Sequence, residues 1–329
     1  MKKILIFGAT GNIGVYFTDY CIQQNNQDYE FIAVGRKKTN FFEKHGINYV
    51  QVDLTKEEDF LKLPSENVYA IVNLAGAMPA YLKNNDPFIY ANTNIIGGIR
   101  VLEYARRVHC DRVIYTQSWS ELGGYWGKVE KLSPDMPVNM VYKGDHAFYV
   151  ISKNFVVNAM EYYKQEYGIK NFVFRLPNIY LYNPQKKYFV DGEEKFISYR
   201  KMIDTVSSGH DIEMWGDPKA FKDIIYVKDL CQMMYLALFA NVNGGTYNAG
   251  TGIKTTLKEQ IEGIVKVFAP YNSEVNIISK PEKNTFTSFV MDISNIKNDL
   301  GYEPKYDYIQ YLRDYKEEEK LKRFDELFI

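Results

Sequence analysis

The chain has 329 residues, a formal net charge of −1, 46% hydrophobic and 25% charged residues. This length allows one large domain or two modest ones. The near-neutral charge gives no reason to expect nucleic acid or an anionic membrane as a partner, and no apolar run approaches transmembrane length. The three cysteines and four histidines are scattered, so no spacing suggests a metal site or a disulfide framework. With a strand starting at once and no signal-peptide pattern, we expect a reducing, cytoplasmic setting.

The chain opens with an apolar strand, a glycine turn and a helix. Residues 4–7 are typical of a strand buried on both faces, three glycines follow at three-residue spacing, and a helical pattern runs over 15–22. This order predicts a dinucleotide-binding turn, in which the N–H groups of the helix start face a pyrophosphate. An ordinary strand-to-helix turn that carries glycines is the alternative. The residues expected at the cofactor are Gly8, Thr10, Gly11, Asn12, Ile13 and Gly14.

The second strand, at 29–34, ends in a basic turn. In a dinucleotide fold this position meets the adenosine ribose, where an acid would accept from the 2′-hydroxyl and repel a 2′-phosphate. Arg36 and Lys37 stand there, and Arg36 could pair with a phosphate. The turn favours NADP over NAD, with a solvated basic surface as the alternative.

The third and fourth strands, at 48–52 and 69–74, end in further candidates. Asp53 could meet the adenine or cap a helix near Lys56. Small residues after the fourth strand would let a ribose approach the backbone. The residues expected at the cofactor here are Asp53, Leu54, Leu74, Ala75 and Gly76.

A helix at 87–109 precedes a fifth strand at 112–116, and Ser118 follows that strand. Tyr149 and Lys153 lie four apart on a later helix and share one face. An ammonium near a phenol favours the phenolate and lowers the phenol's pKa, which suits proton transfer. Taken alone, the pair could be chance on an amphipathic helix, and Ser118 a turn former.

Together these motifs resemble the extended short-chain dehydrogenase/reductase family, in its NAD-dependent epimerase/dehydratase, nucleotide-sugar-modifying branch. Later segments continue the resemblance in the family's order: 175–180 (R-L-P-N-I-Y), 222–229 (K-D-I-I-Y-V-K-D), 247–252 (Y-N-A-G-T-G) and 300–304 (L-G-Y-E-P). The implied fold is α/β, a Rossmann-like doubly wound parallel sheet with a smaller C-terminal substrate-binding lobe. The expected division gives 1–182 and 224–250 to the dinucleotide domain, and 183–223 and 251–329 to the lobe.

The resemblance also implies the roles of the site residues. Tyr149 exchanges the hydroxyl proton of a sugar, Ser118 hydrogen-bonds the same oxygen, and Lys153 lowers the tyrosine pKa and holds the nicotinamide ribose. Asn94, which otherwise reads as a helix-surface residue, helps to order the lysine. Further expected contacts are Thr116 and Pro177 with the cofactor, and Met78, Ser118, Trp119, Asn178 and Lys222 with the substrate.

Two residues depart from the family pattern, and one absence narrows the function. Leu122 replaces a tyrosine, and Lys222 replaces an arginine that would grip a diphosphate with two hydrogen bonds. The 4,6-dehydratases carry Thr-Asp-Glu where this chain has Ser118-Trp119-Ser120, so the acid and base for water expulsion are missing. An NAD(P)-dependent nucleotide-sugar epimerase or 4-keto-sugar reductase remains, with a non-catalytic NAD(P)-binding regulator or scaffold as the alternative. The sugar, the nucleotide and the direction of reaction stay open.

Four further expectations concern architecture. The Gly- and Pro-rich loop at 119–146 could cover the substrate, a helix is expected at 196–207, and the tail at 307–329 reads as a charged amphipathic outer helix with Leu321, Phe324 and Phe328 on one side. The resemblance also implies a homodimer through the helices at 87–109 and 149–167, and both are apolar on more than one face. Packing of these residues against the parent sheet and the 119–146 loop is the alternative. The apolar positions are Ile95, Ile96, Ile99, Val101, Phe155, Val156, Val157 and Met160.

Overall fold

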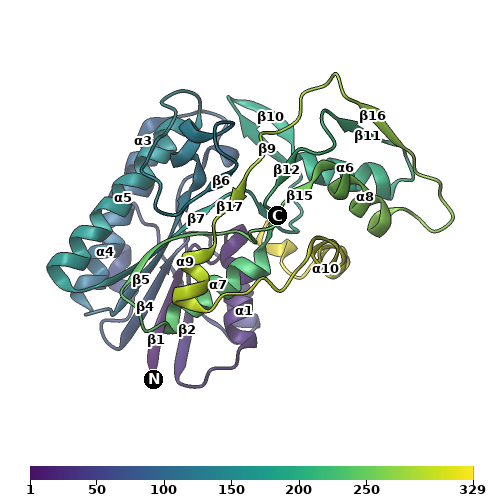
Figure 1. The fold of residues 1–329 in the computed structure, drawn as a ribbon. Coiled ribbons are helices and arrows are strands. Elements are labelled where there is room, and N and C mark those ends of the chain that lie inside the picture. Colours follow the sequence, from purple (N-terminus) through teal and green to yellow (C-terminus); the bar gives the residue numbers. More distant parts are fainter. Residues whose placement is uncertain (329) are drawn as a thin grey trace.

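A seven-stranded parallel sheet forms the centre of the molecule (Figure 1), in the computed structural model that describes residues 1–328. Its order is β14-β7-β5-β4-β1-β2-β3. The predicted doubly wound α/β fold is confirmed. The strands are β1 (Lys2–Phe7), β2 (Tyr29–Gly35), β3 (Asn48–Gln51), β4 (Val68–Asn73), β5 (Arg112–Ser118), β7 (Lys170–Leu176) and β14 (Gly244–Asn248).

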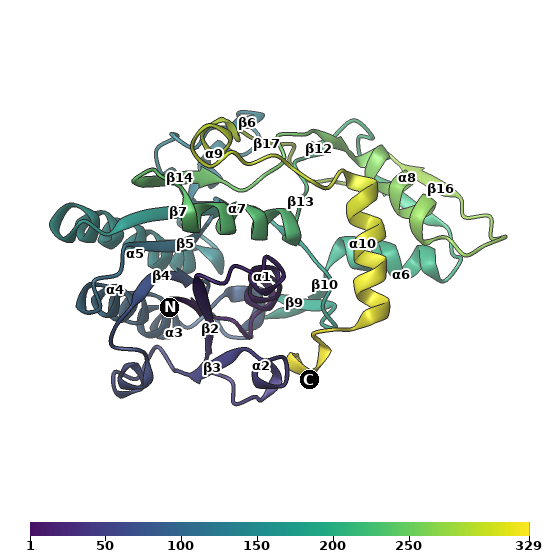
Figure 2. The ribbon, with the colours of Figure 1, turned by 90° about the horizontal axis from the view of Figure 1, so that it is seen from below.

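Helices cover both faces of the sheet, which explains the unbroken apolar run of β1. Ile4 and Ile6 belong to the core under α1 (Asn12–Gln23), α7 (Val227–Phe239) and α9 (Ser294–Leu300). Leu5 and Phe7 belong to the core under α4 (Gly97–Arg107) and α5 (His146–Tyr167). Figure 2 shows these two helical layers on either side of the strands. A strand between two helical layers has no solvent-facing side, so the sequence shows no alternation.

The helix expected at 87–109 is present but irregular. It consists of α3 (Pro87–Tyr90), a π-helical segment η3 (Ala91–Ile96) and α4. The Asp86 side chain accepts from the Phe88 N–H and caps the start. A π-helical turn places one more residue in the turn than an α-helix does, and such turns are frequent at functional sites. Here the segment carries Asn94, which is 4% exposed and faces the interior.

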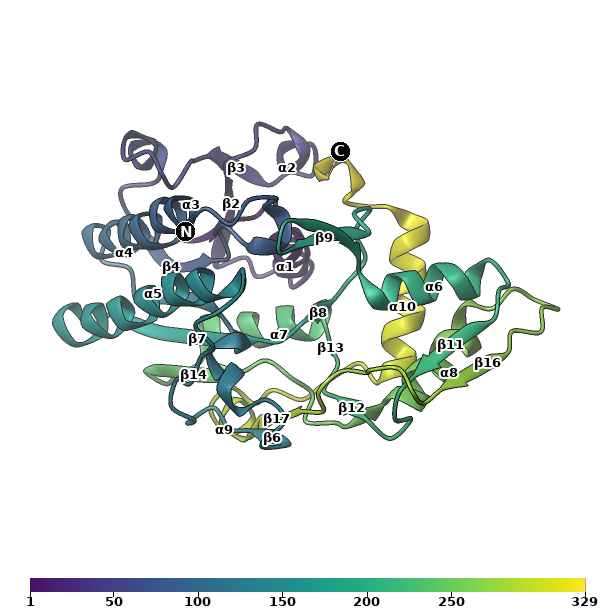
Figure 3. The same cartoon turned by 90° about the horizontal axis from the view of Figure 1, so that it is seen from above.

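The second lobe lies beyond the carboxyl ends of the sheet strands (Figure 3). The helix expected at 196–207 begins at Ser198 because Ile197 is extended. Tyr180 and Tyr226 continue the chain from the sheet into this lobe as a short parallel pair. The elements are β8 (Ile179–Tyr180), β9 (Lys187–Val190), β10 (Glu193–Phe196), α6 (Ser198–Ser207), β11 (Ile212–Trp215), β12 (Phe221–Lys222), β13 (Ile225–Tyr226), β15 (Thr255–Thr256), α8 (Leu257–Phe268), β16 (Ile277–Lys280) and α10 (Tyr308–Leu321).

The segment at 119–146 is anchored at several points. It contains a 3-10 helix, η4 (Trp119–Tyr125), and β6 (Lys131–Leu132), which pairs with β17 (Val290–Met291). Glu121 and Arg175 form an ion pair whose Oε1–Nε distance is 2.5 Å, and both side chains are 4% exposed. A strand pair and a buried ion pair hold this segment, so it is a structured part of the fold. Its role in covering a substrate stays a prediction.

The end of the chain differs from the expected continuous helix. α10 stops at Leu321, and Lys322 takes a left-handed backbone conformation with φ 51°. Leu321 is 63% exposed, whereas Phe324 is buried and packs edge-on against Tyr16 of α1 at 4.9 Å between ring centroids. The helix prediction beyond Leu321 is therefore wrong, because the chain turns back to bury Phe324. Ile329 lies outside the described residues.

Candidate active site

One large cavity opens at the carboxyl edge of the sheet. Its volume is about 2180 Å³, and it is lined by the glycine turn, by the ends of β2, β3, β4, β5 and β7, and by α6 and β9 of the second lobe. Small-molecule pockets are commonly about 300–1,000 Å³. The cavity therefore has room for two ligands, one against the sheet and one towards the second lobe.

The glycine turn at this cavity is suited to a dinucleotide. A Cβ on Gly14 would lie 2.0 Å from the Gly8 carbonyl oxygen, so Gly14 permits the contact between α1 and the turn. A Cβ on Gly8 would lie 2.7 Å from the Ala75 nitrogen, and its φ is +79°. Position 8 therefore requires glycine because of its backbone conformation and the close approach of the segment that follows β4.

The start of α1 has the donors that an anion needs. Gly11, at the N-cap, forms no side-chain cap, so the first N–H groups of the helix have no side-chain acceptor among residues 1–328. The Oδ1 atom of Asn12 is buried without a hydrogen-bond partner among residues 1–328, while its Nδ2 group donates to the Tyr81 hydroxyl. A helix N-terminus favours a phosphate through its N–H groups and dipole. The residues present fit the pyrophosphate of a dinucleotide.

The adenosine end of the cavity contains the basic turn. Arg36 and Lys37 both line the cavity and are exposed. Lys37 donates to the Leu327 carbonyl oxygen at 2.8 Å, which ties β2 to the C-terminal segment η5 (Asp325–Leu327). Within residues 1–328, the hydrogen bond at Arg36 is that of its backbone carbonyl, which accepts from Gln51 Nε2 at 3.0 Å. The structure therefore distinguishes two basic residues that look equivalent in the sequence.

Asp53 lines the same end of the cavity, but it does not cap a helix. Its Oδ1 atom accepts from the Thr55 N–H at 2.9 Å and from the Thr55 hydroxyl at 2.8 Å. The next helical element is the 3-10 helix η1 (Glu58–Lys62), which forms no side-chain cap. The capping prediction is therefore wrong, because a local Asx turn takes the carboxylate.

Asn94 joins the loop after β4 to α5, the helix that carries Tyr149 and Lys153. Its Oδ1 accepts from the Ala77 N–H at 2.7 Å, and its Nδ2 donates to the Ala77 carbonyl and to Ser152 Oγ, at 3.1 and 2.9 Å. Neither Asn94 nor Lys153 lines the cavity. The surface reading of Asn94 is wrong, since its side chain braces the loop after β4 against α5 from behind.

Tyr149 lines the cavity, and Lys153 lies one turn further along α5, 5% exposed. Burial lowers the pKa of Lys153 to about 7. Burial, with smaller effects from Tyr90 and Tyr81, raises the pKa of Tyr149 above its ordinary value. The expected lowering of the phenol pKa by Lys153 is therefore wrong for the protein alone, because desolvation dominates both groups.

Ser118 is positioned by its neighbours at the end of β5. Its Oγ accepts from the Ser120 N–H at 3.2 Å, and its own N–H donates to Gln117 Oε1 at 2.6 Å. The Nε2 of Gln117 donates to Asn154 Oδ1 on α5 at 2.6 Å. Gln117 thus couples the strand that carries Ser118 to the helix that carries Tyr149. Sequence reasoning missed it, because one glutamine at a strand end has no pattern.

The substrate end contains every residue predicted for it. Burial lowers the pKa of Lys222 to about 8, and its Nζ lies 3.8 Å from the centroid of the Phe286 ring. Trp119 packs between Trp126 and Phe289, with ring centroids at 4.4 and 4.3 Å. The predicted cavity-lining residues at this end are Met78, Ser118, Trp119, Asn178 and Lys222.

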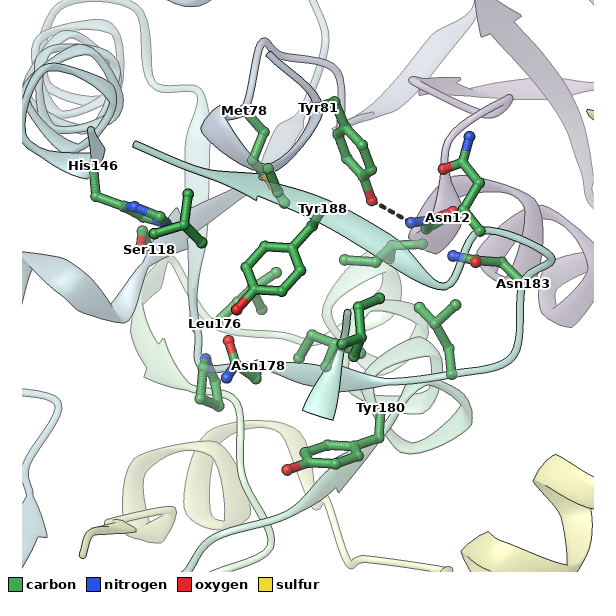
Figure 4. A pocket seen from close by; sticks show the side chains of 18 of the residues that line it. Asn12, Met78, Tyr81, Ser118, His146, Leu176, Asn178, Tyr180, Asn183 and Tyr188 are labelled. Carbon is green, nitrogen blue, oxygen red and sulfur yellow. Dashed lines mark hydrogen bonds between the residues drawn. The ribbon is translucent and has the colours of Figure 1, made fainter. Parts of the chain in front are cut away.

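Figure 4 shows side chains at this end that the sequence did not single out. Tyr188 of β9 extends across the cavity with its hydroxyl directed towards Asn178, and His146 of α5 is directed towards Ser118. His146 Nδ1 lies 2.7 Å from Asp145 Oδ1. An acid and a histidine in succession, three residues before Tyr149, are the signal that could have indicated this pair.

Two negative results apply to residues 1–328. None of their helices is long and apolar enough to cross a membrane. No group of three or more of their His, Cys, Asp and Glu side chains could hold a metal ion.

A doubly wound parallel sheet, with a glycine turn facing a cavity at its carboxyl edge, defines a Rossmann-type dinucleotide-binding protein. The model of the NAD dependent epimerase/dehydratase family matches residues 4–250, which is most of the chain. The chain belongs to this family, and it is an enzyme of the NAD-dependent sugar epimerase/dehydratase type. The predicted family is confirmed.

Known proteins are similar to this chain over nearly its full length. A putative UDP-glucose 4-epimerase of Methanocaldococcus jannaschii is 26% identical over 310 residues, which cover 92% of this chain and 94% of that protein. A UDP-glucose 4-epimerase of Thermotoga maritima, solved with UDP-glucose, superposes with a TM-score of 0.74, 22% identity and coverage of 97% and 98%. The Thermus thermophilus UDP-glucose 4-epimerase in complex with NAD superposes with a TM-score of 0.73 and 19% identity. The match covers 97% of this chain and 99% of that chain. The two structures support the fold.

Proposed function

We propose that the protein is an NAD(P)-dependent nucleotide-sugar epimerase or 4-keto-sugar reductase that transfers hydride at a sugar carbon. One observation carries the proposal: Gly11, Tyr149 and Lys222 line a single cavity, which runs from the glycine turn past Tyr149 to the second lobe. A dinucleotide at the turn and a nucleotide sugar towards the lobe would meet beside Tyr149. The relatives named as UDP-glucose epimerases support this substrate class.

The nicotinamide, when bound, supplies the hydride acceptor or donor. Tyr149 exchanges the proton of the reacting sugar hydroxyl, and Ser118 Oγ hydrogen-bonds the same oxygen. Because the pKa of Lys153 is about 7, its amine can gain or lose a proton near neutral pH when the charge around it changes. A positive charge on a bound nicotinamide would favour the phenolate and offset the desolvation of Tyr149.

The second lobe supplies the contacts for the nucleotide. Asn178 would donate to a diphosphate from the exposed loop after β7, and Lys222 would meet it as a point charge. Partial burial of the Lys222 ammonium is unfavourable until an anion arrives. Trp119 and Ser120 replace the acid pair of the 4,6-dehydratases, which favours epimerisation or reduction over dehydration.

We further propose NADP as the preferred cofactor, on the strength of Arg36 at the end of β2. We propose a homodimer through α5 and the helix made of α3, η3 and α4, where apolar side chains of α3, η3 and α5 remain exposed. The three cysteines are unpaired and buried, which suits the reducing cytoplasm.

The test is to incubate the protein with UDP-glucose, UDP-glucuronic acid, UDP-N-acetylglucosamine, dTDP-glucose and the 4-keto forms of these sugars, with and without added NADPH. An epimerase converts a sugar without external NADPH, whereas a reductase consumes NADPH with a 4-keto sugar. Tight binding of NAD or NADP without turnover of any member would overturn the proposal in favour of a non-catalytic binding protein.

A further inference from the structure

A second titratable side chain stands beside Tyr149 at the catalytic end of the cavity. His146 precedes Tyr149 by three residues on α5, so both lie on one helical face. Their ring centroids are 6.2 Å apart with an interplanar angle of 89°. His146 lines the cavity, and Figure 4 shows its ring directed towards Ser118.

Asp145 fixes the orientation of the His146 ring. The Oδ1 atom of Asp145 lies 2.7 Å from His146 Nδ1, and its Oδ2 accepts from the Asp191 N–H at 3.0 Å. The Asp145 side chain is 12% exposed, while that of His146 is 47% exposed. Burial alone would raise the pKa of Asp145, but the hydrogen bonds from Asp191 and His146 hold it below its ordinary value. The carboxylate therefore stays charged and holds the ring through Nδ1, so Nε2 is the ring nitrogen that Asp145 leaves free.

The hairpin of β9 and β10 fixes the second oxygen of this carboxylate. Asp191 and Gly192 occupy its two-residue turn, both at positive φ, 50° and 80°. The turn is an Asp-Gly sequence, which favours such a conformation. Asp145 therefore joins the wall formed by β9 to the histidine, and His146 is held from outside its own helix.

We propose that His146, oriented by Asp145, is a second proton-transfer residue that acts on a carbon-bound hydrogen next to a sugar ketone. The inference rests on the proposed function, which generates or accepts a ketone at C4. A ketone acidifies the hydrogens on its neighbouring carbons, C3 and C5. Trp119 and Ser120 cannot remove such a proton, and Glu121 is committed to its ion pair with Arg175.

The step balances without a redox partner. His146 Nε2 takes the proton from C5 of a 4-keto sugar, and the electrons of the broken C5–H bond form a C4=C5 double bond with the charge on the C4 oxygen. Ser118 and Tyr149 hydroxyls stabilise this enolate by hydrogen bonds. A proton from the imidazolium or from water returns to C5, and the ketone is restored with either configuration. The proton on C3 can be exchanged in the same way. The enzyme could therefore change the configuration at C3 or C5 as well as at C4.

The test uses sugars that already contain the ketone: dTDP-4-keto-6-deoxyglucose and UDP-4-keto-6-deoxyglucose, each with the cofactor-loaded enzyme in D2O. We expect deuterium at C3 or C5, detected by NMR and mass spectrometry. His146→Gln should slow this uptake by a factor of about 100 or more, the usual effect of a positioned acid–base group. His210→Gln, at an exposed histidine outside the cavity, is the matched control and should exchange like the unchanged enzyme.

Asp145 is a positioning residue in this proposal. Asp145→Asn keeps the shape and an acceptor for the Asp191 N–H but loses the charge. It should lower the exchange rate at saturating probe by a factor of about 10 without changing KM, and Asp145→Glu should restore part of the rate. A rise in KM with an unchanged maximal rate would contradict the positioning role.

Two results would overturn the proposal. One is the absence of deuterium uptake by the unchanged enzyme with either ketone probe, and the other is undiminished uptake by His146→Gln. The proposed function is tested separately, by measuring hydride transfer with the panel of nucleotide sugars. Hydride transfer without deuterium uptake would leave the function standing and remove the role of His146.

Discussion

The ammonium of Lys153 lies 3.9 Å from the centroid of the Tyr115 ring. Tyr115 stands on β5 and is 2% exposed, so the lysine rests against a buried aromatic face. No hydrogen bond within residues 1–328 joins the side chains of Lys153 and Tyr149. The face of an aromatic ring attracts a cation, but it solvates the charge less well than water does. The lowered pKa of Lys153 reflects this position.

The pKa of Lys153 makes stability depend on pH. The lysine titrates at about 7 in the folded chain and at about 10.4 when unfolded. Between these values the unfolded state binds more protons, so the free energy of unfolding should rise with pH, by at most about 1.4 kcal/mol per pH unit. Urea unfolding of the cofactor-free protein at pH 6 to 9, compared with Lys153→Met, isolates this contribution. A difference between the two proteins that does not change with pH would contradict the buried, uncharged lysine.

Tyr149→Phe tests the acid–base role. The substitution removes only the hydroxyl, so folding and cofactor binding should persist while turnover falls by a factor of roughly 100 or more. Steady-state rates with the substrate found in the nucleotide-sugar panel give the measurement. Tyr162→Phe, at a 55% exposed tyrosine on the same helix, is the matched control. Near-normal turnover in a folded Tyr149→Phe protein would contradict the acid–base role of Tyr149.

Arg36→Ala tests the cofactor preference. If the guanidinium pairs with a 2′-phosphate, the substitution should weaken NADP binding by about 1.5–3 kcal/mol and barely affect NAD. Lys38→Ala, at an exposed neighbour that does not line the cavity, should change neither affinity. Calorimetric titration with both cofactors decides the matter. Equal weakening of NAD and NADP, or tighter native binding of NAD, would identify the turn as a solvated surface.

The sequence predicted what short-range patterns determine. The run from Ile4 to Phe7 indicated a doubly buried strand, and the spacing of Gly8, Gly11 and Gly14 indicated the turn that follows. The structure confirms this order of strand, turn and helix. It could be predicted because the apolar pattern and the glycine positions are set by residues that are close in the sequence. The same patterns led to the family, which the family model confirms over residues 4–250.

Long-range contacts were beyond those patterns. The bond between Gln117 and Asn154 joins residues 37 apart, and the Lys153–Tyr115 contact joins a helix to the strand beneath it. The inward direction of Asn94 depends on a π-helical segment, and nothing in the run from Ala91 to Ile96 distinguishes it from an α-helix. Desolvation of Tyr149 likewise depends on which surfaces meet around it, so its pKa could not be read from the spacing to Lys153.

The proposed homodimer can be tested on the outer surface of the helices. Val101, Val156 and Met160 are buried within the subunit, so part of the apolar pattern is explained by intramolecular packing. Ile96 and Phe155 remain 42% and 45% exposed, on the helices expected to pair.

Such exposed apolar side chains on neighbouring helices are suited to a two-fold contact that would also brace the helix of Tyr149 and Lys153. Phe155→Glu should therefore shift the protein from dimer to monomer in light scattering at micromolar concentration, and lower its activity on dilution. Ile253→Glu, at a 52% exposed position in the second lobe, should leave the mass unchanged. A monomeric mass for the unchanged protein, with full activity on dilution, would refute the dimer and leave these positions as ordinary exposed surface.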